Sequence, residues 1–215
     1  MPDTVFADRK DAGRRLGAAL SEQGFGDEGA VVAGIPRGGV VVAGEVAAEL
    51  DLPLRAVVAR KLGAPSQPEL AIGALGPDGA PLLDESLVTR LRVSEQWLTH
   101  VVDQERAELA SRMENFPGVI GRDDVAGKVV IVVDDGVATG ATAAAVGAWL
   151  AHAGAARRVL ALPVAPSSTL RRLERAYDDI VVLAQPAQFV AVGQWYRDFT
   201  QTTDDEVIAL LSQQS

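Results

Sequence analysis

Two adjacent carboxylates, Asp134 and Asp135, follow the apolar run VVIVV at 129–133 and precede the Gly- and Thr-rich turn GVATGAT. The run is typical of a buried strand, and the Ala-rich sequence after the turn is typical of a helix. Small residues let backbone N–H groups approach an anion, Thr139 and Thr142 add hydroxyls, and a helix N-terminus favours negative charge. A carboxylate beside such a cradle accepts hydrogen bonds from a sugar diol. The pattern predicts a site for a phosphorylated ligand that also carries hydroxyl groups.

Other phosphate-related patterns fit this segment less well. A Walker loop needs Gly-Lys-Ser/Thr, and a dinucleotide fingerprint places its acid about 20 residues after the Gly-rich turn rather than before it. A phosphatase that uses Asp134 as nucleophile would be expected to show an Asp-x-Asp pattern, which Asp134 and Asp135 do not form. A surface turn with helix-capping acids is the remaining alternative. The strand before the acids and the turn after them favour the ligand site.

Residues 129–142 resemble the signature of the type I phosphoribosyltransferases: an apolar strand, two acids, two mostly apolar residues and a Thr/Gly-rich loop. The resemblance implies that Asp134 and Asp135 bind the ribose 2- and 3-hydroxyls of phosphoribosyl pyrophosphate. It also implies a 5-phosphate loop that consists of Val137, Ala138, Thr139, Gly140, Ala141 and Thr142. The chain departs from the family at Gly136, where an aliphatic residue is usual, and this change removes no ligand-binding side chain.

Upstream, the sequence GIPRGGV at 34–40 is similar to the family's pyrophosphate loop, which follows the first strand of the core. The resemblance implies that Gly38 and Gly39 let backbone amides approach the pyrophosphate and that Arg37 adds positive charge. It also implies a non-proline cis peptide in this loop, which we expect between Pro36 and Arg37. A plain Pro-Gly turn is the alternative interpretation.

Arg60 and Lys61 stand at the expected end of the next strand, where many family members place cations for the leaving pyrophosphate. Guanidinium suits paired phosphate oxygens and ammonium supplies a point charge, so both residues join Arg37 as expected catalytic cations. A solvated strand end is the alternative. Glu69, in the Gly/Pro-rich stretch that follows, is a weaker candidate for an acid that acts on a nucleobase.

The acceptor side carries a weaker signal. Family members that act on hypoxanthine and guanine usually have Asp where this chain has Ala138, so that specificity is disfavoured. Four of the ten aromatic residues lie between 189 and 199. An aromatic side chain there could stack on a planar acceptor, with Trp195 and Tyr196 as the preferred candidates. Packing of a small satellite core is the alternative.

Strands and helices alternate around these loops. Apolar runs predict strands at 31–35, 54–60, 129–133, 157–165 and 179–185, and periodic apolar residues predict helices at 6–20, 39–50, 94–114, 141–154, 167–176 and 203–211. This alternation indicates an α/β fold with a parallel sheet covered by helices on both faces. We expect a single type I phosphoribosyltransferase-like domain over 1–215, with an insertion at about 61–118 that contains a mobile loop, a hairpin and a long helix, and a small C-terminal hood at about 184–215.

Composition excludes several partners. The 215 residues carry 20 basic and 29 acidic side chains, a net charge of -9, which argues against a nucleic-acid partner because phosphate neutralisation needs a basic face. There is no cysteine, so disulfides and thiolate metal sites are excluded. The longest apolar run is far shorter than the roughly 20 residues of a membrane span, and no signal peptide is visible, so no membrane partner and a cytoplasmic location are expected.

The sequence thus predicts a phosphoribosyltransferase that moves the 5-phosphoribosyl group from phosphoribosyl pyrophosphate to a nitrogen of a nucleobase-like acceptor and releases pyrophosphate. Mg²⁺ is the expected cofactor, held by pyrophosphate and ribose oxygens and by Asp134 or Asp135, directly or through water. The expected partners are phosphoribosyl pyrophosphate, a small nitrogen-containing acceptor and, as an open alternative, further copies of the chain. A non-catalytic sensor of phosphoribosyl pyrophosphate is the alternative function.

Overall fold

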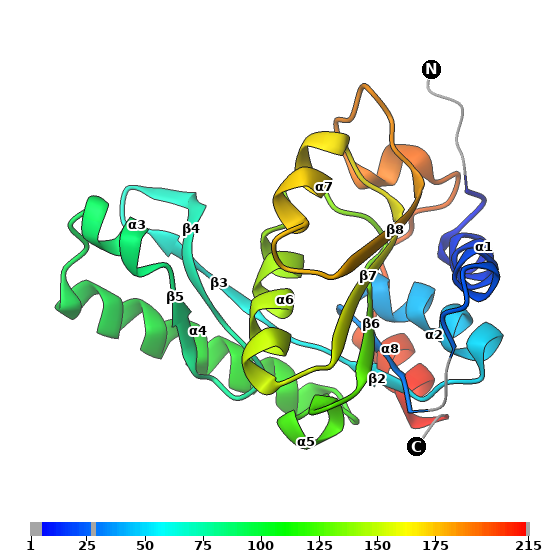
Figure 1. The fold of residues 1–215 in the computed structure, drawn as a ribbon, viewed down its shortest axis with the longest axis horizontal. Coiled ribbons are helices and arrows are strands. Elements are labelled where there is room, and N and C mark those ends of the chain that lie inside the picture. The colour runs from blue at the N-terminus through cyan, green and yellow to red at the C-terminus, as the bar shows by residue number, and fades with distance from the viewer. Residues whose placement is uncertain (1–5, 27–28, 214–215) are drawn as a thin grey trace.

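A sheet of five parallel strands, in the order β2-β1-β6-β7-β8, runs through the centre of the protein (Figure 1). The computed structural model describes residues 6–26 and 29–213, apart from the side chain of Glu69. Successive residues of a strand point to opposite faces, so Val31 and Ala33 belong to one hydrophobic cluster and Val32 to the other. The strands are β1 (Val31–Gly34), β2 (Leu54–Ala56), β6 (Val129–Val133), β7 (Arg157–Val164) and β8 (Asp179–Ala184).

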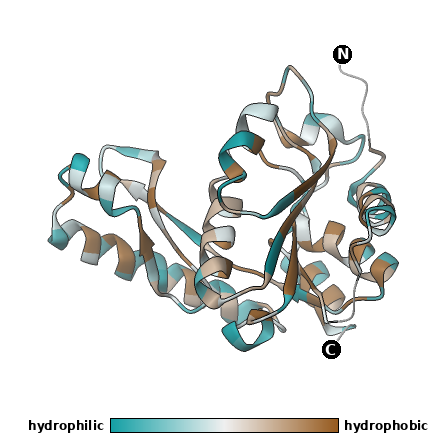
Figure 2. Ribbon diagram, viewed as in Figure 1, coloured by the Kyte–Doolittle hydropathy of each residue, from teal (hydrophilic) through white to brown (hydrophobic). Residues whose placement is uncertain are grey.

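Helices cover both faces of this sheet, which confirms the predicted fold class. One face packs against α1 (Arg9–Glu22), α2 (Gly38–Leu50) and α8 (Asp204–Ser212). The other packs against α6 (Ala141–Ala153) and α7 (Ser167–Leu173), with the short α5 (Arg122–Val125) before β6. Figure 2 shows hydrophobic residues concentrated on the central strands, as expected for strands that are buried on both sides.

Residues 60–116 form an arm that extends from the main body, at the left of Figure 1. Its antiparallel sheet has the order β3-β4-β5, and α3 and α4 follow. The elements are β3 (Arg60–Ala64), β4 (Gln67–Leu75), β5 (Pro81–Leu83), α3 (Glu85–Arg90) and α4 (Glu95–Asn115). Next to β4, Gly76 lies directly against the Trp149 ring of α6, which fixes the arm to the main body.

The structure corrects one expectation about this region and adds to another. The strand expected at 54–60 ends at Ala56, and Arg60 begins β3 instead, because the chain leaves the parallel sheet once Val57 N–H has bonded to the Gly34 carbonyl. A continuous apolar run cannot reveal this change of sheet. The insertion at about 61–118, in which a mobile loop is expected, also contributes to the core, because Leu62 and Ile72 are fully buried. The predicted hairpin is confirmed as the antiparallel pair β4-β5.

The N-terminal end of the described chain lies against the segment that follows β8. Phe6, expected inside the first helix, instead lies before α1 and forms a parallel bridge with Tyr196. The segment after β8 is irregular except for the short 3₁₀ helix η1 (Val192–Trp195). None of the helices in the described ranges is long and apolar enough to span a membrane.

Candidate active site

The register of the main sheet brings the two predicted loops together. Gly34, the last residue of β1, is the parallel partner of Val133, the last residue of β6. The N–H of Ile35 donates to the Val133 carbonyl over 2.9 Å, so the pairing continues one residue beyond the strand. The 36–39 loop and the acid pair therefore leave the same edge of the sheet side by side, at the carboxyl ends of the strands, where open α/β sheets bind ligands.

Gly38 and Gly39 lie in direct contact with the acid pair. A Cβ at position 39 would stand 2.8 Å from the Val133 carbonyl oxygen and 2.9 Å from the Asp134 Cα. A Cβ at position 38 would overlap the Asp135 carboxylate. Glycine is therefore required here for close approach between the loop and the acids. The expected cis peptide between Pro36 and Arg37 is confirmed.

Two helix N-termini flank the acids without a side-chain cap. The N-cap of α2 is Arg37 and the N-cap of α6 is Gly140, and neither side chain bonds to the first turn of its helix. Gly140 has φ of 71°, in the left-handed region that favours glycine. The first N–H groups of any helix lack partners within it. Such uncapped ends, with their positive dipole ends, form binding sites for anions.

Two side chains of helix α7 donate hydrogen bonds to backbone carbonyls of the 136–142 turn. The Thr169 hydroxyl donates to the Ala138 carbonyl over 2.6 Å, and the Arg172 guanidinium donates to the Thr139 carbonyl over 3.1 Å. These oxygens would repel a bound anion if they faced it. Because α7 engages them, the turn can offer N–H groups and the exposed Thr139 and Thr142 side chains instead.

The two acids differ in their electrostatic surroundings. Burial and the neighbouring Asp135 carboxylate raise the pKa of Asp134 well above its usual range. Burial also raises the pKa of Asp135, while the hydrogen bond and charge of Arg9 oppose that rise. The Arg9 Nε donates to the Asp135 Oδ2 over 2.8 Å. Arg9 was not predicted from sequence, because 126 positions separate it from Asp135 and it is one of several arginines on α1.

A cavity of about 620 Å³, here called the arm cavity, extends from the acid pair along β3 and α4. Asp134, Pro36 and Thr142 line its main-body side, and the predicted cations Arg60 and Lys61 line its arm side. The structure therefore brings the acid pair, the two predicted loops and the predicted cations to one cavity, whereas Trp195 and Tyr196 do not line it. The approach of the arm cations to the acids was not indicated by their positions in the sequence.

Inside the arm cavity, Arg60 is paired with an acid that sequence reasoning missed. Its Nε and Nη2 atoms both lie 2.6 Å from the Oε2 of Glu105, which projects from α4. Arg112, also on α4, lines the cavity as a further cation. Glu105 is one of several charged residues on this helix, and helical periodicity alone does not show which of them faces β3.

A second cavity of about 550 Å³, the terminal cavity, also reaches the acids. Pro36 and Asp134 line both cavities, so the two adjoin at these residues, whereas Asp135 lines only the terminal cavity. The terminal cavity is further bordered by Arg9, Arg37 and Phe199. Arg37 is exposed there, and its Nη1 lies 3.7 Å from the Asp204 carboxylate of α8.

Trp195 and Tyr196 lie in a satellite core rather than on an exposed stacking surface. They are 7% and 5% exposed and pack with Phe6 and Val164. The Tyr196 hydroxyl donates to the backbone carbonyl of Asp135. Of the two alternatives drawn from sequence, the structure favours packing, because the rings are covered by one another and by the N-terminal segment. Tyr196 thus contacts the acid pair through its hydroxyl, and its ring face is packed against other side chains.

Two further positions bear on the sequence predictions. Gly136, where the family usually has an aliphatic residue, lies in contact with Val192 and Val164, so the C-terminal segment fills the space that a side chain would take. Glu69 lies within β4, but its side chain is outside the described part of the chain.

The acids could contact a metal ion but do not form a complete metal site. Within residues 6–26 and 29–213, no three His, Cys, Asp or Glu side chains group closely enough to hold an ion. Asp134 is nonetheless a largely buried carboxylate whose raised pKa reflects poor compensation of its charge. Carboxylate oxygen is a preferred ligand of Mg²⁺, which usually keeps several waters and binds substrate phosphates. This donor set fits an ion that arrives with a phosphorylated substrate.

Comparisons with known proteins agree with this geometry. Two Mycobacterium tuberculosis proteins, named "Putative phosphoribosyl transferase Rv0571c" and "Putative phosphoribosyl transferase MT0597", are each 45% identical over 207 residues, which is 96% of this chain and 46% of theirs. The chain thus spans about half the length of these relatives. The crystal structure of TT1426 from Thermus thermophilus superposes with a TM-score of 0.87 at 39% identity, covering 98% of this chain and 99% of that one. The phosphoribosyl transferase domain family matches residues 4–196. This chain belongs to that family.

Proposed function

We propose that this chain transfers the 5-phosphoribosyl group of phosphoribosyl pyrophosphate to a nitrogen atom of a nucleobase-like acceptor and releases pyrophosphate, with Mg²⁺ bound to the donor. One observation carries the proposal: the acid pair lies between two uncapped helix N-termini, those of α2 and α6. Phosphoribosyl pyrophosphate carries one anionic group at C5 and another at C1 of a ribose, with the two free hydroxyls on the same ring. Two anion sites with carboxylates between them match that order of groups.

The proposal assigns each end of the donor to one loop. The 5-phosphate binds at residues 137–142, before α6, and the pyrophosphate binds at residues 36–39, before α2. Asp134 and Asp135 accept hydrogen bonds from the ribose hydroxyls. The glycine contacts between the 36–39 loop and the acids support this assignment, since they place the pyrophosphate loop directly against the carboxylates that would bind the ribose.

The cations suggest where the leaving group is stabilised. Arg60 and Lys61 line the arm cavity, and Arg37 borders the terminal cavity, which shares Pro36 of the pyrophosphate loop with it. The pyrophosphate would therefore lie near Pro36, where cations of both cavities can reach it. In the reaction the bond from ribose C1 to pyrophosphate oxygen breaks and its electron pair leaves with pyrophosphate. A bond from the acceptor nitrogen to C1 forms, and that nitrogen loses its proton.

Positioning and electrostatic stabilisation would supply most of the catalysis, without a covalent nucleophile. Mg²⁺ supplies charge neutralisation of the pyrophosphate oxygens when it is bound. The protein's own residues bind the sugar, orient C1 toward the acceptor and present Arg37, Arg60 and Lys61 to the departing group. Asp134 is the residue that would contact the ion, directly or through water.

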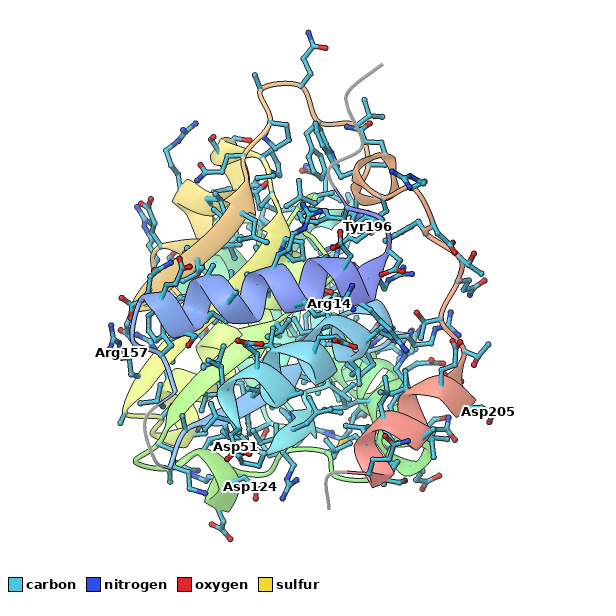
Figure 3. The ribbon with its side chains drawn as sticks, turned by 90° about the vertical axis from the view of Figure 1, so that its right-hand side faces the viewer. Arg14, Asp51, Asp124, Arg157, Tyr196 and Asp205 are labelled. Atoms are coloured by element: carbon cyan, nitrogen blue, oxygen red, sulfur yellow. The ribbon has the colours of Figure 1, made fainter. Side chains whose placement is uncertain are left out.

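Calorimetric titration with phosphoribosyl pyrophosphate and Mg²⁺ tests the proposal. We expect saturable binding by the wild type and its loss in Asp134→Asn/Asp135→Asn. The matched control is Asp123→Asn/Asp124→Asn, a second adjacent acid pair, located in α5 at the opposite end of β6; Figure 3 shows Asp124 far from Tyr196. Equal affinity in the first double variant and the wild type would exclude the assignment.

A non-catalytic sensor of the same ligand is the second candidate. The observation in its favour is the ion pair between Arg60 and Glu105, which engages the cation that catalysis would need for pyrophosphate. Incubation with phosphoribosyl pyrophosphate, Mg²⁺ and a panel of nucleobases separates the two functions. Release of pyrophosphate that depends on one base indicates the transferase, and binding without release for any base indicates the sensor.

A further inference from the structure

Arg9, at the start of α1, connects the acid pair to the C-terminal segment. Its Nε donates to the Asp135 Oδ2 over 2.8 Å, and its Nη1 donates to the Thr200 carbonyl over 2.8 Å. Its guanidinium lies 3.8 Å from the centroid of the Phe199 ring. The Arg9 side chain is only 12% exposed. Three contacts in three directions therefore hold this guanidinium in one place.

Asp135 has further contacts besides Arg9, one at its backbone and one at its carboxylate. The Tyr196 hydroxyl donates to its backbone carbonyl. Gly38 lies against its carboxylate, and a Cβ at Gly38 would stand 2.7 Å from the Arg9 Nε. The carboxylate is thus enclosed by the pyrophosphate loop on one side and by the two terminal segments on the others.

We propose that Arg9 is a positioning residue for Asp135, which it orients for the ribose of the donor. The proposal rests on the proposed function, because the ribose is the group that Asp135 would bind. The last torsion of an aspartate side chain has a broad distribution, so an unsupported carboxylate rotates freely. A charge-assisted bond from a guanidinium fixes that rotation. Arg9 engages Oδ2, which leaves Oδ1 to accept the hydrogen bond from a ribose hydroxyl.

This role explains why the N-terminal helix belongs to the site although it contributes nothing to either anion-binding loop. Orientation before binding reduces the entropy that the complex loses, so it strengthens affinity without a direct contact between Arg9 and the ligand. The expected effect of Arg9 therefore passes entirely through Asp135. A residue that supported only the fold would affect ligand binding in the same way whatever stood at position 135.

A double-mutant cycle on the full chain tests the inference. The dissociation constant of phosphoribosyl pyrophosphate with Mg²⁺ is measured for wild type, Arg9→Met, Asp135→Asn and the double variant. A hydrogen bond to a charged group predicts that Arg9→Met weakens binding roughly tenfold to hundredfold. In the Asp135→Asn background, Arg9→Met should change the logarithm of the dissociation constant by less than a third as much. The effects of two substitutions do not add when the residues act through one another. Arg9→Lys, which keeps the charge, should bind more tightly than Arg9→Met. If Arg9→Met fails to fold, Arg9→Lys takes its place in the cycle, alone and together with Asp135→Asn.

Arg14→Met is the matched control, since Arg14 lies on the same helix and its side chain is 59% exposed (Figure 3). It should leave the dissociation constant unchanged within twofold. If the wild type binds the donor but loss of Arg9 has no effect, or has the same effect with Asn at position 135, the inference is wrong and the proposed function stands. If the wild type does not bind the donor, the proposed function fails, and the inference fails with it.

Discussion

Replacement of Gly39 by alanine tests whether the pyrophosphate loop must pack against the acid pair. The new Cβ would lie 2.8 Å from the Val133 carbonyl oxygen, 2.9 Å from the Asp134 Cα and 3.0 Å from the Asp134 Oδ1. Two of these three atoms are backbone, so no side-chain rotation relieves the overlap. The start of α2 must therefore move away from the end of β6.

The expected magnitude follows from two opposing effects. Overpacking of a well-packed site costs about 1–3 kcal/mol. Alanine in place of glycine inside a helix recovers about 0.5–1 kcal/mol. The net loss in free energy of unfolding is then roughly 0–2.5 kcal/mol, with a midpoint of about 1.3 kcal/mol. For a chain of this size each kcal/mol shifts Tm by about 2–4 °C, so Tm should fall by roughly 3–5 °C at that midpoint and by about 10 °C at most.

Gly44→Ala is the matched control, because it makes the same substitution in the same helix. A Cβ there would meet only the Leu210 Cδ2 at 3.7 Å and the Leu54 Cδ2 at 4.0 Å, which are ordinary contacts. We expect Gly44→Ala to raise the unfolding free energy by about 0.5–1 kcal/mol, the full gain in helix propensity. The two variants should therefore change stability in opposite directions.

Urea denaturation and thermal unfolding measure the stabilities, and calorimetry with phosphoribosyl pyrophosphate and Mg²⁺ measures the site. We expect Gly39→Ala to weaken binding at least tenfold, since the displaced loop no longer aligns its N–H groups with the pyrophosphate. Gly44→Ala should bind as the wild type does. The reasoning is refuted if Gly39→Ala is as stable as Gly44→Ala and retains wild-type affinity.

Three further predictions follow from contacts around the acids. Folding raises the pKa of Asp134. Above about pH 4 the unfolded chain therefore releases a proton that Asp134 of the folded chain still holds. The free energy of unfolding falls as pH rises from there toward the pKa of Asp134 in the folded state. Asp134→Asn should thus raise Tm at pH 8 and not at pH 3.5, and equal shifts at both would contradict this. Tyr196→Phe should lower the unfolding free energy in urea by about 0.5–1.5 kcal/mol through loss of its bond to Asp135; an unchanged value would show that this bond contributes nothing. Glu105→Gln should tighten and Arg60→Gln weaken calorimetric binding of Mg²⁺-pyrophosphate, and the same affinity in both variants would exclude Arg60 as its ligand.

The acid pair and the turn after it could be predicted because their chemistry is local. A strand, two carboxylates and a small-residue turn lie within 14 consecutive residues, 129–142, and local sequence determines local backbone. The 36–39 loop and its cis peptide at Pro36–Arg37 were expected from the resemblance of GIPRGGV to the family's loop. The carboxyl ends of parallel strands share one edge of a sheet, so even the meeting of the two loops was foreseeable.

Residues that act across long separations were not predictable in this way. Arg9 and Glu105 each lie among other charged residues on a helix, and no periodicity distinguishes the one that meets the site. The aromatic residues of the C-terminal segment showed the opposite difficulty. Trp195 and Tyr196 have the composition of a stacking surface, yet Phe6, from the other end of the chain, covers them. Burial depends on which distant segments pack together.

The sequence by itself predicted the alternation of strands and helices and the acid pair with the Gly- and Thr-rich turn after it, because each depends on neighbouring residues and on the intrinsic chemistry of their side chains. Its resemblance to a known family added the expected role of the 36–39 loop. The tertiary structure alone decided which charges are paired, which rings are covered and that two cavities adjoin at Asp134. Those properties arise from packing and from the register of Gly34 with Val133, which bring together groups that the chain holds far apart.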